Sequence, residues 1–167
     1  MEDRTAGFPL TTLTAGEILS GQEEKALSVT PDTTISDALR LMVEKDTGSV
    51  LIMEEGKVLG IWTERDLMQD ILSENFDMNR ARIGDHMSTD LRYASSDDPI
   101  FLLLDKFFGH RIRHLLIQDK GEFAGLLGMS EVIRASLTDM TRQLKELNTM
   151  VSLDFYEGWK WRKKKKE

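Results

Sequence analysis

The sequence predicts an α/β (α+β) fold. In it, two copies of a strand-helix-strand-strand-helix unit pack as a pseudo-twofold pair, followed by a C-terminal helical extension. The first observation is an internal duplication, because Ser28–Leu72 aligns without a gap on Tyr93–Leu137. The second is that identical residues fall at the same offsets in both copies: Asp32 and Asp97, Ile35 and Ile100, Leu39 and Leu104, Leu51-Ile52 and Leu116-Ile117, Gly56 and Gly121, Gly60 and Gly125, Leu72 and Leu137. A repeat of this length predicts two similar units with a cleft between them. A chain of 167 residues with 40% hydrophobic content is long enough for one compact core or for two small cores that share an interface.

The first copy begins with a strand and a helix. Ala26–Val29 is a short strand candidate, and Pro31-Asp32 marks a turn after it. Thr34 with Asp37 three residues later resembles a capping box and predicts a helix start. The apolar residues that follow share one helical face: Ile35, Ala38, Leu39, Met42 and Val43. We expect Gly48 to end this helix.

A hairpin and a second helix complete the first copy. Val50–Met53 and Val58–Trp62 are two strand candidates joined through Glu54–Lys57, whose glycine is a hairpin turn signal. Thr63 is expected to begin a helix that runs to about Leu72.

The second copy has the same order with different residues. Asp98-Pro99 predicts an N-cap followed by proline at the first helical position. Five apolar residues supply the expected buried face of this helix: Ile100, Leu103, Leu104, Phe107 and Phe108. Leu115–Ile117 and Phe123–Leu127 are the strand pair, with a turn at Asp119–Gly121.

A short related segment precedes each copy, since Gly16–Ser20 resembles Gly84–Ser88. We expect the chain to divide into six parts: an N-terminal segment 1–14, the first repeat 15–74, a linker 75–82, the second repeat 83–137, a C-terminal helix 138–158, and an aromatic and basic tail 159–167.

The C-terminal part carries an apolar seam and then a basic tail. Leu137, Met140, Leu144, Leu147 and Val151 alternate spacings of three and four, which predicts a helix that packs on its own module or on a second chain. Four aromatic residues lead into the basic run: Phe155, Tyr156, Trp159 and Trp161. The tail is either a solvated end or a contact for an anionic membrane, RNA or the acidic body of a neighbouring chain.

Composition and charge restrict the class of protein. The net charge is −7, although Lys160–Glu167 holds six basic residues and one acid, so the body of the chain is strongly acidic. An acidic body disfavours nonspecific binding of nucleic acid. Without cysteine there is no disulfide, thiol nucleophile or thiolate metal site. No apolar run has membrane-spanning length, and the N-terminus lacks the regions of a signal peptide, so we expect a soluble, cytoplasmic protein.

Two motifs within this repeat pattern resemble a known family. Gly60-Ile61-Trp62-Thr63-Glu64-Arg65-Asp66 closes the first repeat, and Arg111-Ile112-Arg113-His114-Leu115-Leu116-Ile117 lies in the second. Together with the duplication they resemble a tandem pair of cystathionine-beta-synthase (CBS) domains, often called a Bateman module. The resemblance covers about residues 15–137, and it is greatest to small stand-alone bacterial proteins of this family.

The resemblance implies a ligand site in the cleft between the repeats, for an adenosine-containing compound. In the first copy, Asp66 is placed to accept hydrogen bonds from the ribose hydroxyls. Thr63 offers a hydroxyl and a helix N-terminus to a phosphate or ribose oxygen, and Arg65 reaches toward a phosphate from the same turn. Thr-x-x-Asp at a helix start is also a capping pair that needs no ligand, so both interpretations stay open.

The second copy departs from this pattern. Gly128 stands at the threonine position and Glu131 at the aspartate position, while Ser130 keeps one hydroxyl nearby. Arg113 and His114 match the basic pair that in the family faces ligand phosphates, and the alternative is a solvated basic edge. We therefore expect an altered second site and one ligand per chain.

Metal binding and catalysis are not expected. His110 and His114 are four residues apart, but the chain between them leaves a helix and enters a strand, and no third ligand is evident. Nothing resembles a nucleophile with its base, and Gly121–Gly128 lacks the spacing and ending of a P-loop. We expect no enzyme activity, no metal and no obligatory cofactor.

Three functional hypotheses remain. The first is a ligand-sensing regulatory module that binds AMP, ADP, ATP or S-adenosylmethionine and modulates an effector protein in trans or its own assembly. The second is a structural dimerisation protein with vestigial clefts. The third is binding of nucleic acid or an anionic membrane through the basic tail. The resemblance also implies a homodimer formed by packing of the CBS repeats.

Overall fold

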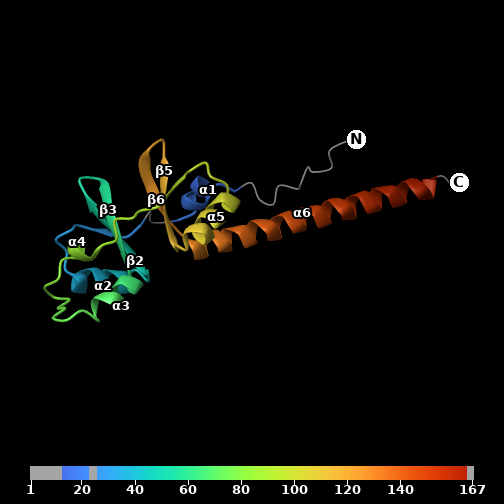
Figure 1. The fold of residues 1–167 in the computed structure, drawn as a ribbon. Coiled ribbons are helices and arrows are strands. Elements are labelled where there is room, and N and C mark those ends of the chain that lie inside the picture. The colour runs from blue at the N-terminus through green and yellow to red at the C-terminus, as the bar shows by residue number, and fades with distance from the viewer. Residues whose placement is uncertain (1–12, 23–25, 165–167) are drawn as a thin grey trace.

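A computed structural model describes residues 13–22 and 26–164, with side chains described as far as Thr149. The expectations for residues 1–12 and 165–167, and for the side chains of Val151 and the tail aromatics, lie outside the described residues. Figure 1 shows two units side by side, with one long helix that projects from the second unit toward the C-terminus.

The duplicated element order is confirmed. The first unit holds β1 (Ser28–Val29), α2 (Ile35–Glu44), β2 (Ser49–Glu54), β3 (Lys57–Thr63) and α3 (Glu64–Asp70). The second holds β4 (Tyr93–Ser95), α5 (Ile100–His110), β5 (His114–Asp119), β6 (Glu122–Gly128) and α6 (Met129–Lys164). Two short helices, α1 (Ala15–Ser20) and α4 (Ile83–His86), precede the two copies. In each unit a parallel first strand pairs with the second strand, which pairs antiparallel with the third.

The two hairpins have the same geometry down to single residues. Glu55 and Gly56 take φ values of 48° and 80°, and their counterparts Lys120 and Gly121 take 50° and 89°. Positive φ at both turn positions is typical of the two-residue hairpin turn that fits the twist of its strands. The strand register also shifts after Ile52 in one hairpin and after its counterpart Ile117 in the other. The duplication therefore includes the backbone irregularities as well as the element order.

Two predicted helix ends were wrong by a few residues. Helix α2 ends at Glu44 rather than at Gly48, because Asp46 takes the left-handed conformation with φ of 51°. The carbonyl of Gly48 instead accepts a hydrogen bond from the Glu64 N–H at 3.2 Å. Pro99 is the N-cap of α5 and not its first helical residue, since its backbone is extended at ψ of 157°. The Asp98 carboxylate accepts a hydrogen bond from the Lys106 ammonium at 2.6 Å.

The cores follow the predicted apolar stripes, with one exception in each repeat. Three predicted residues of each helix are buried: Ile35, Ala38 and Met42, and Ile100, Leu103 and Phe107. Val43 and Phe108, expected on the same faces, are 75% and 65% exposed, so that expectation was wrong. Each directly follows the last buried residue of its helix, and one position turns a helical side chain by about 100° away from the core.

The short helices α1 and α4 pack on the opposite repeat from the one they precede. Ala15 lies in the core of the second unit with Ile100 and Leu127, whereas Ile83 lies in the core of the first unit. The Gly16 N–H donates to the Ser96 carbonyl at 2.8 Å. In the same way, the Gly84 N–H donates to the Pro31 carbonyl at 3.0 Å. A Cβ at Gly84 would lie 2.9 Å from the Cβ of Pro31, so this close approach requires glycine.

Helix α6 buries a mixed face and exposes its apolar seam. Val132, Ser136 and Asp139 are buried, and Asp139 accepts hydrogen bonds from Arg142 at 2.5 Å and Gln143 at 2.9 Å. Leu137 and Leu144 are 60% and 62% exposed, so the alternative in which the seam packs on its own module is wrong for these residues. Among the described residues, no helix is both long and apolar enough to cross a membrane.

Candidate functional site

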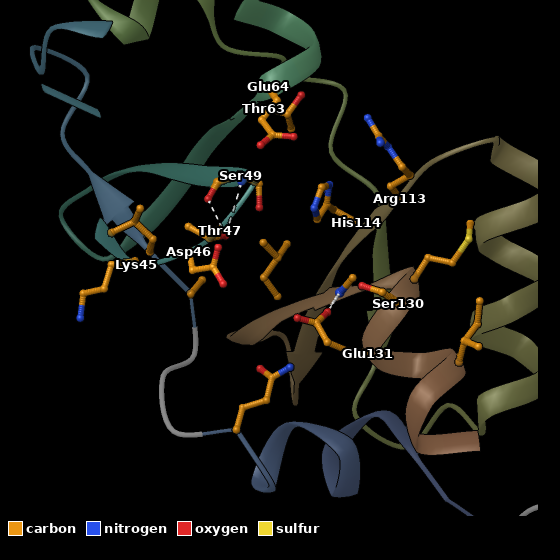
Figure 2. A pocket seen from close by; sticks show the side chains of 18 residues that line it. Lys45, Asp46, Thr47, Ser49, Thr63, Glu64, Arg113, His114, Ser130 and Glu131 are labelled. Carbon is orange, nitrogen blue, oxygen red and sulfur yellow. Dashed lines mark hydrogen bonds between the residues drawn. The ribbon is translucent and has the colours of Figure 1, made fainter. Parts of the chain in front are cut away.

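A large cavity lies between the two repeats. Its volume is about 830 Å³, within the range of sites that hold a small molecule. Figure 2 shows Thr63 and Glu64 from the first repeat on one side, Ser130 and Glu131 from the second on the other, and the His114 ring between them. The cavity therefore takes side chains from both copies, as a cleft between repeats requires.

A smaller cavity of about 190 Å³ adjoins the large one, because Thr63, Arg113 and His114 line both. Arg65 and Asp66 line only the smaller cavity. Ser130 and Glu131, in contrast, line only the larger one. We call the two together the inter-repeat cleft, and it brings together all seven candidate ligand residues named from the sequence.

The two cavities are related by the pseudo-twofold of the repeats. In six pairs of aligned positions, the first residue lines the smaller cavity and the second lines the larger one: Thr63 and Gly128, Arg65 and Ser130, Asp66 and Glu131, Arg111 and Asp46, Arg113 and Gly48, His114 and Ser49. Since the residue types differ at each of these positions, the same backbone frame presents different chemistry on its two sides.

Asp66 is both a helix cap and an available acceptor. Its Oδ2 accepts hydrogen bonds from the Thr63 N–H and from the Thr63 hydroxyl, each at 2.8 Å. These bonds form the capping pair that the sequence left as an alternative. Its other oxygen, Oδ1, accepts no hydrogen bond from the described residues. A carboxylate can accept several hydrogen bonds, so one oxygen holds the helix start while the other stays open to a ligand.

Gly128 and Glu131 are a matched replacement for that pair. The Gly128 N–H donates to Oε2 of Glu131 across the start of α6, as the dashed line in Figure 2 shows. A side chain at Gly128 would collide with this oxygen. In this position of Glu131 the glycine leaves room for the carboxylate, and the second repeat keeps its cap without a threonine.

His114 is held in its neutral form by its surroundings. Burial lowers the pKa of His114, the neighbouring Arg113 guanidinium lowers it further, and the Asp66 carboxylate opposes both effects. An imidazole with a lowered pKa gains a proton readily only when an anion arrives beside it. The charged groups around the His114 ring therefore act on its pKa in opposite directions.

The sequence interpretation missed several lining residues. In the larger cavity these are Lys45, Asp46, Thr47, Ser49 and Glu64, and in the smaller they are Asp90, Arg92 and Arg111. A signal for some of them was present, because Arg113 and His114 align with Gly48 and Ser49. Once one copy supplies cleft residues from this loop, the repeat predicts that the other does too. In the described part of the chain, no group of three or more His, Asp or Glu residues is placed to hold a metal ion.

Comparisons with known proteins agree with this architecture. The family model for the CBS domain matches twice, at residues 16–73 and 83–138. The mitochondrial CBS domain-containing protein CBSX3 of Arabidopsis thaliana is 26% identical over 156 residues, which cover 87% of this chain and 74% of that protein.

Solved structures of similar fold have the same paired repeats. A protein with CBS domains from Burkholderia ambifaria superposes with a TM-score of 0.71 at 25% identity, over 76% of this chain and 96% of that chain. A CBS domain protein of Pyrobaculum aerophilum, solved as a complex with AMP, has a TM-score of 0.64 at 18% identity, over 78% and 99% of the two chains.

Proposed function

Since the chain belongs to the CBS domain family, whose members are generally regulatory modules, we propose that it is a non-catalytic sensor of an adenosine-containing nucleotide. The ligand binds in the inter-repeat cleft and changes the geometry of the repeats, which modulates an effector protein in trans or the assembly of the chain itself. A ligand can shift the equilibrium between two conformations only if it binds them with different affinity. The proposal therefore requires two relative positions of the repeats that bind the nucleotide with different affinity.

The observation that carries this proposal is that Asp66 of the first repeat and the pair Arg113 and His114 of the second line the same cavity. Oδ1 of Asp66 suits a ribose hydroxyl, whereas Arg113 and His114 suit a phosphate. A ribose phosphate carries both groups a few ångströms apart. The AMP-bound relative of similar fold makes AMP the first ligand to test.

Calorimetric titration with adenosine, AMP, ADP, ATP and S-adenosylmethionine tests the proposal. At one hundred times its dissociation constant, a ligand of the native state adds about 2.7 kcal/mol to the free energy of unfolding, which a thermal melt detects. Absence of both heat and stabilisation for all five compounds would contradict the proposed function.

The binding of a phosphate-bearing nucleotide should strengthen as the pH is lowered from 8 to 6. The folded protein holds His114 neutral with a lowered pKa, and an incoming phosphate raises that pKa, so binding takes up a proton. The linkage limits the gain to about tenfold per pH unit. The free energy of unfolding of the protein without ligand has the opposite pH dependence. It decreases as the pH falls through the ordinary range of histidine pKa values, because the unfolded chain takes up the proton that folded His114 does not. Isothermal titration at several pH values measures the slope.

His114→Gln is the control for this pH dependence, since glutamine keeps a polar side chain but cannot titrate. The phosphate's own protonation is common to both proteins, so the difference between their slopes belongs to His114. Equal slopes for the two proteins would remove His114 from the ligand site.

We propose that a second copy covers the outer helical faces, which gives a homodimer through CBS packing. Exposed apolar side chains stand at aligned positions on both repeats: Val43 and Phe108, and Leu72 and Leu137. Because the positions are related by the pseudo-twofold, they form a surface that a two-fold partner matches on both repeats. An exposed apolar surface of this kind marks a protein interface.

Phe108→Ser should weaken this dimer by about tenfold or more, because a large exposed aromatic side chain is removed from the proposed interface. Tyr93→Ser is a matched control, since Tyr93 is also an exposed aromatic but lies on β4 and outside the aligned surface. Sedimentation over a concentration series measures the dissociation constant. A dimer that loses stability equally with both variants does not use this surface.

A purely structural role is the second candidate. Asp66 and Glu131 each cap the helix that follows, so both motifs have a use that needs no ligand. This candidate requires that adenosyl compounds neither bind nor copurify, and that the dimer forms with the same affinity whether or not nucleotide is added.

A further inference from the structure

We propose that the smaller cavity is a polyphosphate subsite, in which Arg92 and Arg111 bind phosphates beyond the first. This inference rests on the proposed function, because it concerns which nucleotide the cleft selects. The volume of about 190 Å³ is below that of a site for a whole ligand, so the cavity holds one part of a molecule whose remainder lies elsewhere in the cleft.

The smaller cavity carries an excess of positive charge. Its acidic lining residues are Asp66 and Asp90, whereas its basic ones are His114 and four arginines: Arg65, Arg92, Arg111 and Arg113. A single phosphate is matched by Arg113 and His114. The remaining guanidinium groups outnumber Asp66 and Asp90, the carboxylates of this cavity. A planar guanidinium binds phosphate oxygens in pairs, so these groups can accommodate further phosphates.

The arginines are present in only one of the two repeats at each pair of aligned positions. At the aligned positions of the other repeat stand Ser130 for Arg65, Leu27 for Arg92, Asp46 for Arg111 and Gly48 for Arg113. All four residues line the larger cavity, and none is basic. The aligned positions on the two sides of this pseudo-symmetric frame thus differ in charge: the smaller cavity has four arginines, whereas the larger cavity has Lys45 and shares Arg113 and His114 with the smaller one.

Arg111 ends helix α5 in the left-handed conformation, with φ of 54° and ψ of 39°. Glycine is favoured at such a helix end and asparagine is tolerated, whereas a long side chain is disfavoured there. Its counterpart Asp46 has a similar φ of 51°, and aspartate tolerates this region. A cation also suits a helix C-terminus, which lysine would satisfy as well. Glu55 and Lys120 take similar φ values in the hairpin turns, so the evidence for a role of the Arg111 side chain is its place in the lining of the smaller cavity.

Arg92 lines the same cavity. It forms an ion pair with Asp90 at 2.8 Å, and its side chain is 43% exposed. The partner carboxylate orients the guanidinium without burying it, so the group is available to a phosphate that reaches the cavity. Arg92 directly precedes β4 and Arg111 directly follows α5, so the two arginines reach the cavity from different segments of the second repeat.

The test is the ratio of ATP to AMP affinity, measured by calorimetry without divalent cations. The wild-type protein should prefer ATP by about tenfold or more, since extra charge-assisted pairs form with the added phosphates. Arg111→Gly and Arg92→Leu should each reduce this preference to about threefold or less while changing AMP affinity by less than about twofold. Arg40→Leu is the control, because Arg40 is an exposed arginine that pairs with Asp37 outside the cleft.

Misfolding is separated from loss of the subsite by a thermal melt. Glycine takes positive φ without strain, so Arg111→Gly should unfold at the wild-type temperature or above it. Equal affinity of the wild type for AMP and ATP would overturn the inference, as would an unchanged ratio in both arginine variants. In either case AMP binding persists and the proposed function stands; no binding of any adenosine compound ends both.

Discussion

Asp66→Ala is expected to lower the affinity for the nucleotide by about 10- to 150-fold, since a hydrogen bond to a charged group contributes about 1.5–3 kcal/mol. The loss comes from Oδ1, the oxygen that the helix cap leaves open. Oδ2 caps α3 through Thr63, so the variant also loses some stability, about 1 kcal/mol for a cap of this kind. Calorimetric titration with the best ligand of the wild type measures the affinity.

Asp37→Ala separates the two effects. Asp37 lies three residues after Thr34, as Asp66 does after Thr63, and it also caps a helix: its N–H donates to the Thr34 hydroxyl at 3.1 Å and its carboxylate accepts from that hydroxyl at 2.7 Å. It lines neither cavity. This variant should lose comparable stability and keep its affinity. If Asp66→Ala binds as tightly as Asp37→Ala, then Asp66 is a structural cap only.

Phe107→Ala is expected to lower the free energy of unfolding by about 3–5 kcal/mol, the usual cost of removing a buried aromatic side chain. Phe107 is 0% exposed and packs in the core of the second unit against residues from the sheet and from α1. The loss is a large part of the total stability of a domain of this size, which is about 5–15 kcal/mol. Urea unfolding followed by circular dichroism measures it.

The neighbouring Phe108→Ala is the matched comparison, because the same chemical change falls on a side chain that is 65% exposed. In dilute solution, where the chain is monomeric, Phe108→Ala should change the stability by less than about 0.5 kcal/mol. At concentrations where the dimer forms, its effect should grow. Equal losses for the two variants in dilute solution would mean that Phe108 is part of the core.

Features that depend on a few neighbouring residues could be predicted from the sequence. The hairpin turns required glycine at positive φ, and Gly56 and Gly121 are where the duplication placed them. The helix start at Thr63 followed from Thr-x-x-Asp in the same way. These elements are determined locally, so one sequence without relatives was sufficient.

Features that depend on what covers a surface could not be predicted. Val43 and Phe108 match the helical period of the core, and periodicity cannot distinguish a side chain buried in its own unit from one left for a partner. Likewise, the resemblance of Gly16–Ser20 to Gly84–Ser88 was visible in the sequence, but not which sheet each helix would contact. The charge difference between the cavities needed the structure, because Arg92 and Arg111 are nearly twenty residues apart in the chain.

The exchange of α1 and α4 has a consequence for how the chain is made. A ribosome releases α1 first, yet the core that receives Ala15 is completed by β6 and α6, which are the last elements of the fold to emerge. In the first repeat, in contrast, the helix that completes the core is α4, which is synthesised soon after the sheet. Translation therefore finishes the core of the first repeat before that of the second, and α1 is synthesised well before the sheet on which it packs. Cutting such a gene between the repeats would give two fragments, each with the other's helix.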